Sequence, residues 1–297
     1  MNRSALFLVI LLSLVGAPEP ASAQNGEPAW LVVKRAERLM DAGEFGLAIR
    51  SFRLALDLSP NDPDALYGLG RAYKAINDLV VAEDYLSRAL GRRDAFAVPE
   101  TALLVRYELA DIHRTRRDFA RYEQELAAIV AADPIPDDAL IPDDPHRVLR
   151  EQGLDRFLVL YRLPESGSTD ARSRLAELLV GFGRYDVAAM HASVAVLQSF
   201  TTLIDAARDR DPTYEFSTIV GLMERADSYP EAREYLERST LYHDLYYLAA
   251  ALWAETRDGA LPVWRLLARI DPEGQWGVRA ARQLERPRVE PLLVPRR

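Results

Sequence analysis

The chain of 297 residues contains no cysteine, only four histidines, and only two lysines against 35 arginines. Without cysteine it can form no disulfide, has no thiolate nucleophile and offers no sulfur ligand to a metal. Its formal net charge is −8, and an acidic balance of this size disfavours nonspecific binding to nucleic acid. The stability of such a chain must come from packing.

Motifs of catalytic and cofactor sites are also missing. The histidines share no metal-ligand spacing, and the chain has no HExxH, no GxSxG and no phosphate-binding loop. We therefore expect no enzyme activity, no cofactor and no metal site. The histidines are His113, His146, His191 and His243, and we expect His113 to be packed or partly exposed rather than to act as a ligand or base.

The N-terminus carries a conspicuous apolar run. Arg3 supplies a charged region, Ala5 to Val15 an apolar region of 11 residues, and Ala21-Ser22-Ala23 a small-residue cleavage site. This order is typical of a secretory signal peptide, so we expect residues 1–23 to be removed. An uncleaved membrane anchor is the alternative, but 11 residues are fewer than the roughly 17 to 25 that span a bilayer. The mature protein is expected to be periplasmic or secreted, with no membrane span.

A 34-residue period organises the first part of the chain. A shift of 34 residues superimposes residues of similar size: Ala48 on Ala82, Phe52 on Leu86, and Ala55 on Ala89. Apolar residues at three- and four-residue spacing predict amphipathic helices, and short polar breaks divide each repeat into two helices. Each repeat is therefore predicted to be a helical hairpin.

This pattern resembles the tetratricopeptide-repeat (TPR) family, which has small residues at three fixed positions, a large apolar residue between two of them and a proline near the end. The first repeat matches with Ala36, Ala48, Ala55, Phe52 and Pro60. The second, residues 63–96, matches with Gly70, Ala82, Ala89 and Leu86 but lacks the proline. The resemblance implies an all-α, TPR-type solenoid of helical hairpins that forms a right-handed superhelix. It also explains Gly68-Leu69-Gly70 as a helix contact rather than the start of a dinucleotide-binding fingerprint.

Repeats of decreasing regularity cover most of the mature chain. We expect an N-terminal block of three repeats over residues 29–134, an irregular connection over 135–168, a degenerate TPR-like block with a cap helix over 169–285, and a proline-rich tail over 286–297. The connection carries two acidic pairs: Asp137 with Asp138, and Asp143 with Asp144. These pairs are expected to be a solvated loop, with cation binding or a basic partner as the alternatives.

The resemblance also implies where a partner would bind, because one face of the first helix of each TPR hairpin lines the concave surface. On that face the second and third repeats carry Tyr67, Arg71 and Lys74, then Tyr107, Asp111 and Arg114. Arginine and lysine bind carboxylates and tyrosine gives rigid contact area, so this surface suits an acidic or C-terminal peptide. Ordinary solvated helix surface is the alternative.

A second aromatic set consists of Tyr242, Tyr246 and Trp253. It could line an apolar end of the groove, although core packing is the favoured interpretation. We predict an exported or periplasmic TPR adaptor that binds a protein segment in its concave groove and supports assembly of an envelope complex. A glycan or another small ligand in the same groove is the alternative, and no nucleic-acid partner is expected.

Overall fold

The computed structural model describes residues 27–136, 139, 141–257 and 259–288, and all regular structure in this part of the chain is helical. The fold is an all-α solenoid of helical hairpins, which confirms the fold class predicted from the repeat pattern. The expected signal peptide, the acidic pair Asp137 and Asp138, and the tail from residue 289 lie outside the described residues.

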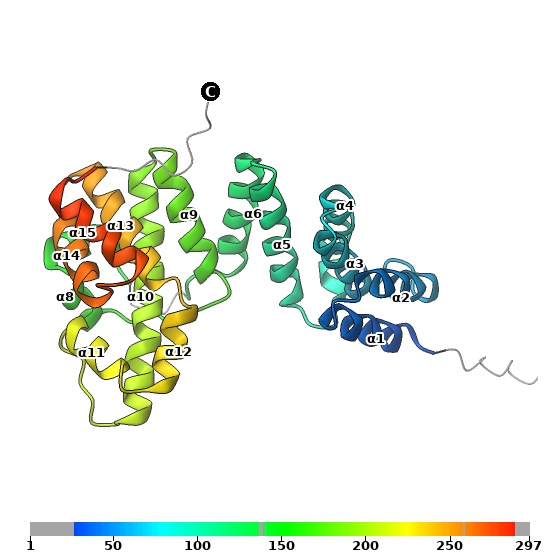
Figure 1. Ribbon diagram of the computed structural model, residues 1–297, viewed down its shortest axis with the longest axis horizontal. Helices are drawn as coiled ribbons and strands as arrows, with labels where there is room; N and C mark the ends of the chain where they lie inside the picture. The colour runs from blue at the N-terminus through cyan, green and yellow to red at the C-terminus, as the bar shows by residue number, and fades with distance from the viewer. Residues whose placement is uncertain (1–26, 137–138, 140, 258, 289–297) are drawn as a thin grey trace, which may run out of the picture.

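Three hairpins form the N-terminal part of the solenoid (Figure 1). They are α1 (Ala29–Asp41) with α2 (Phe45–Leu58), α3 (Pro63–Ala75) with α4 (Leu79–Leu90), and α5 (Thr101–Thr115) with α6 (Phe119–Ala132). A single 3-10 turn, η1 (Arg93–Ala95), lies between the second and third hairpins. Helices α3, α4 and α6 each begin after an aspartate whose side chain accepts a hydrogen bond from an amide of the first turn. Asp62, for example, accepts from the Ala65 amide at 3.0 Å.

Small residues let these helices approach closely. A Cβ added to Gly68 would lie 2.2 Å from the ring of Phe52 in α2, and one added to Gly70 would lie 2.5 Å from Cγ of Leu86 in α4. The alanines that recur at the 34-residue period, including Ala48 and Ala82, have no exposed surface. Both glycines therefore serve helix packing, on opposite sides of α3.

The third hairpin joins two hydrophobic cores. Val105, Leu109 and Ile112 of α5 belong to the core of the first two hairpins, whereas Leu126 and Ile129 of α6 belong to the core of the C-terminal block. Helix α6 packs against α9 (Thr169–Gly181). The stack of hairpins therefore continues across the chain segment 135–168, which leaves the stack after α6 and returns at α9 (Figure 1).

The C-terminal block is built around α10 (Tyr185–Arg210), which packs against α9 and α13. With 26 residues it is about 39 Å long at 1.5 Å per residue. By length and composition it could cross a membrane, but 83% of its apolar window is buried inside the protein. We therefore assign it as a core helix. The remaining helices of the block are α11 (Ile219–Ala226), α12 (Pro230–Arg238), α13 (Leu241–Glu255), α14 (Ala260–Ile270) and α15 (Gln275–Glu285).

The segment 135–168 is more regular than the irregular connection that we expected from the sequence. It contains α7 (Pro145–Gln152) and α8 (Leu154–Leu160), and both helices pack against α10. Pro145 stands in the first turn of α7, where the missing amide hydrogen costs nothing. Phe157 and Leu158 have no exposed surface, so burial of these apolar residues stabilises two short helices that the sequence pattern does not reveal.

Candidate functional site

The first helices of the three N-terminal hairpins border a cavity of about 320 Å³. Tyr67 and Arg71 of α3, both predicted to face a groove, line it, and the Arg71 guanidinium lies 5.5 Å from the centre of the Tyr67 ring. The rim also carries apolar side chains that remain largely in solvent, because Trp30, Val98 and Leu104 are 57%, 54% and 51% exposed. These three side chains offer apolar area for contact with another molecule.

Charges of both signs surround this cavity. Lys34 lies 5.3 Å from the centre of the Trp30 ring and is exposed, as is Glu37 on the same helix. Asp64 accepts a hydrogen bond from the Ala97 amide at 3.2 Å, and its burial raises the pKa of its carboxyl group. Asp62 is occupied as the cap of α3. The cations beside the apolar rim are Lys34 and Arg71, and Arg71 Nε lies 3.9 Å from Glu108 Oε1.

Lys74, predicted to bind an acidic partner, is already paired with carboxylates of the chain. Its Nζ lies 2.6 Å from Glu108 Oε2 and 2.9 Å from Asp111 Oδ2. Asp111 Oδ1 in turn lies 2.6 Å from Arg174 Nη1, and Arg174 Nε lies 2.7 Å from Asp170 Oδ2. Burial lowers the pKa of Lys74, but the hydrogen bonds from both carboxylates outweigh it and raise the pKa. The centre of the predicted basic stripe is therefore a neutralised ion-pair network that ties α3 and α5 to α9.

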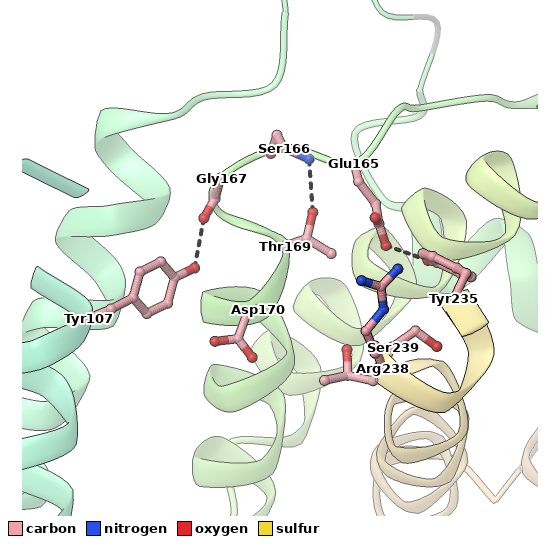
Figure 2. A pocket seen from close by; sticks show the side chains of 10 residues that line it. Tyr107, Glu165, Ser166, Gly167, Thr169, Asp170, Tyr235, Arg238 and Ser239 are labelled. Atoms are coloured by element: carbon pink, nitrogen blue, oxygen red, sulfur yellow. Dashed lines mark hydrogen bonds between the residues drawn. The ribbon is translucent and has the colours of Figure 1, made fainter. Parts of the chain in front are cut away.

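Tyr107 holds the solenoid to the segment that precedes α9. Its hydroxyl donates to the Gly167 carbonyl at 2.7 Å and accepts from the Ala171 amide at 3.0 Å. Burial is the main cause that raises the pKa of Tyr107 to about 12. This side chain is also one wall of a second cavity, of about 490 Å³, whose opposite side carries Tyr235 of α12 (Figure 2).

Most polar groups around this second cavity have partners within the chain. Tyr235 donates to Glu165, Thr169 accepts from the Ser166 amide at 3.0 Å, and Thr240 donates to Asp244 at 2.9 Å. Glu165, Asp170 and Arg238 are the charged residues drawn around this cavity (Figure 2). Asp170 forms an ion pair with Arg174, with Nε and Oδ2 2.7 Å apart. The Arg238 side chain is 72% exposed, and its ion pair with Glu234 is longer, at 3.5 Å.

The structure separates the remaining predicted site residues. Arg114 is exposed on α5, and its side chain makes no hydrogen bond or ion pair with another described residue. Tyr246 is only 2% exposed and packs against Tyr247 and Trp276, so it cannot line a groove. Tyr242 and Trp253 are partly buried against the same core. Core packing, the favoured interpretation of this second aromatic set, explains the burial of Tyr246.

A buried cluster of charged side chains, between α9 and α13, was not predicted from the sequence. His243 Nδ1 lies 2.9 Å from Asp244 Oδ1, and its Nε2 lies 3.5 Å from Glu177 Oε2. Burial lowers the pKa of His243, but the hydrogen bonds to Asp244 and Glu177 outweigh it and raise the pKa to about 9. Ser173 also donates to Asp244, at 2.8 Å. The cluster joins α9 to α13, and its closest members on the two helices, Glu177 and His243, are 66 positions apart in the sequence. No local motif could therefore have predicted it.

Comparison with known families supports one of the predicted repeats. The family model described as TPR repeat matches residues 36–77. This segment is similar to a TPR repeat. The matched segment contains α2, α3 and the last part of α1. Residues of these three helices line much of the smaller cavity. No curated protein matches the chain.

Two solved structures align with most of the chain. YrrB, a TPR protein with an unusual peptide-binding site, is 17% identical with a TM-score of 0.49, over 87% of this chain and 94% of that chain. A Podosopora anserina putative kinesin light chain with nearly identical TPR-like repeats is 15% identical with a TM-score of 0.46, over 84% and 98% of the two chains.

Proposed function

We propose that this chain is an exported adaptor that binds a protein segment along α1, α3 and α5 and so supports assembly of an envelope complex. The observation that carries the proposal is the cavity between these helices, with Trp30, Val98 and Leu104 exposed at its rim. Export rests on the order of charged, apolar and small residues in segment 1–23.

The chemistry of the cavity suits a segment with one large apolar side chain flanked by acidic residues. Burial of an aromatic or aliphatic anchor beside Trp30 would remove exposed apolar area on both molecules from water. Lys34 and Arg71 stand next to this position and would attract carboxylates. Lys74 contributes less than the sequence suggests, because Glu108 and Asp111 already neutralise it.

The first experiment identifies the partner and tests the apolar rim. Crosslinking in the native envelope followed by mass spectrometry names the partner segment, and its affinity for purified residues 24–297 is then measured. We expect Trp30→Ala with Leu104→Ala to weaken binding at least about tenfold. Val80→Ala with Leu58→Ala is the matched control, because both residues are exposed on second helices, away from the cavity. Unchanged binding by the rim variant, or an equal loss in the control, would place the interface elsewhere.

Charge reversal tests the acidic character of the partner. Lys34→Glu with Arg71→Glu should weaken binding, and the effect should shrink as salt screens charges over about 8 to 10 Å. This pair is preferable to one that includes Lys74, because Lys74 makes close contacts of 2.6 and 2.9 Å with Glu108 and Asp111. Arg71 makes only a 3.9 Å contact with Glu108. Retained affinity at low salt would exclude an acidic segment.

The larger cavity suits the alternative, a glycan or another small polar ligand. This cavity of about 490 Å³ lies between Tyr107 and Tyr235, and Asp170 and Arg238 are among the residues that line it (Figure 2). Titration with soluble oligosaccharides, monitored by ligand-observed NMR, tests this function. Binding that is lost in Arg238→Ala would support it, and the absence of any saturable binding would exclude it.

A further inference from the structure

Three side chains from distant parts of the sequence meet at one point of the C-terminal block. His146 lies in the first turn of α7, Asp186 in the first turn of α10, and Glu255 at the last residue of α13. His146 Nε2 lies 3.0 Å from Asp186 Oδ1 and 4.0 Å from Glu255 Oε2. One nitrogen and two carboxylate oxygens thus lie within 4.8 Å of one another.

The histidine ring is buried, and its second nitrogen lies next to a carboxylate. The residue is 7% exposed, and its Nδ1 is buried without a hydrogen bond although Asp144 Oδ1 lies 3.0 Å away. Asp144 is itself fixed, because it caps α7 by accepting from the Arg147 amide at 3.0 Å. In protein metal sites the second imidazole nitrogen commonly donates to a carboxylate in this position, which leaves the first nitrogen free to bind the ion.

We propose that His146, Asp186 and Glu255 bind a divalent transition-metal ion, with Zn²⁺ as the expected occupant and water completing its coordination. An imidazole nitrogen favours Zn²⁺ over Ca²⁺ and Mg²⁺, which prefer oxygen ligands. Zinc bonds of about 2.0 to 2.2 Å in a tetrahedron require ligand atoms about 3.3 Å apart. The separations of 3.0 and 4.0 Å bracket this value, and the exposed Asp186 side chain can adjust.

The site replaces the expectation that the chain holds no metal, and it is independent of the cavity between α1, α3 and α5. Its ligands come from α7, α10 and α13, so the ion would tie the segment that leaves the solenoid to the long central helix. Without an ion, the same three residues would form an ordinary cluster of polar side chains. Metal titration distinguishes these two states.

The test uses residues 24–297, freed of metal by a chelator and titrated calorimetrically with ZnCl₂. We expect one Zn²⁺ per chain, at least about tenfold weaker binding in Asp186→Asn and in Glu255→Gln, and no binding in His146→Gln. The controls Asp57→Asn and Glu273→Gln remove exposed carboxylates elsewhere and should bind as the unaltered chain does. Asp186→Asn keeps the test decisive if His146→Gln does not fold, because the Asp186 side chain is 74% exposed.

A structural readout accompanies the titration. Zn²⁺ should raise the thermal unfolding midpoint of the unaltered chain and slow amide hydrogen exchange in residues 145–160, because a ligand that binds only the folded state stabilises it. Ca²⁺ at the same concentration should do neither. The absence of saturable Zn²⁺ binding, or binding that persists in all three ligand variants, would overturn the proposal.

Discussion

Substitution of Gly68 by alanine sets two effects of opposite sign against each other. Alanine stabilises a helix interior by about 1 kcal/mol relative to glycine. Its Cβ, however, would lie 2.2 Å from the Phe52 ring, where carbon atoms in contact prefer about 3.5 to 4.0 Å. Phe52 is 1% exposed and cannot leave the interface, so the helices must separate by more than about 1 Å. Overpacking costs about 1 to 3 kcal/mol, and an overlap this deep against a buried ring belongs to the upper half of that range. After subtraction of the gain of about 1 kcal/mol, we expect a net destabilisation of about 1 to 2 kcal/mol.

Urea denaturation followed by circular dichroism measures this effect, with Gly46→Ala in α2 as the matched control. A Cβ at Gly46 has no neighbour within 4 Å, so this variant should be neutral or more stable by up to about 1 kcal/mol. Because a solenoid couples mainly nearest neighbours, hydrogen exchange in Gly68→Ala should accelerate in α2 and α3 and stay unchanged in α10. A Gly68→Ala variant as stable as the unaltered chain would refute the close approach of α2 and α3.

Three further outcomes test other parts of the structure. Ala82→Leu should lower the free energy of unfolding by about 1 to 3 kcal/mol, because Ala82 has no exposed surface; an unshifted urea midpoint would argue against the α3–α4 contact. Asp62→Ala should cost about 1 kcal/mol, since the Ala65 amide loses its acceptor, and faster hydrogen exchange at the start of α3 would show it. The pKa of His243 is raised from 6.5 to about 9 by the fold, so its stabilising effect is complete below pH 6.5 and is lost as the pH rises towards 9. Across that window the free energy of unfolding should fall by up to about 3 kcal/mol, and His243→Gln should have a flatter pH profile; equal slopes would contradict the assignment.

The hairpins α1 to α6 could be predicted because their signals are local. The 34-residue period, the polar breaks and residues such as Asp62 and Pro63 act within a few positions of one another. Helix α7 has the same kind of start, at Asp144 and Pro145. However, α7 and α8 are short and lie outside the 34-residue period, and their stability comes from burial of Phe157 and Leu158 in the C-terminal core. Local pattern cannot report burial that depends on contacts with distant parts of the chain.

The candidate site was predictable only in part, for a similar reason. Helical spacing places Tyr67 and Arg71 on one face, and the structure brings both to the cavity with Trp30. The same spacing does not show that Glu108 and Asp111 neutralise Lys74, because that pairing depends on how α3 and α5 are set side by side. The cluster of His146, Asp186 and Glu255 is likewise assembled by three helices that no sequence period relates.

The length of α10 gives the two halves of the molecule different mechanical properties. In the first half each hairpin contacts mainly the next one, so a pulling force applied at the N-terminus would detach the hairpins one after another, in small steps. In the second half α10 contacts α7, α8, α9, α11, α12 and α13, and removal of any one of these helices exposes part of a shared core. Under such a force the first half would therefore yield in several small steps, and the second half in one large step.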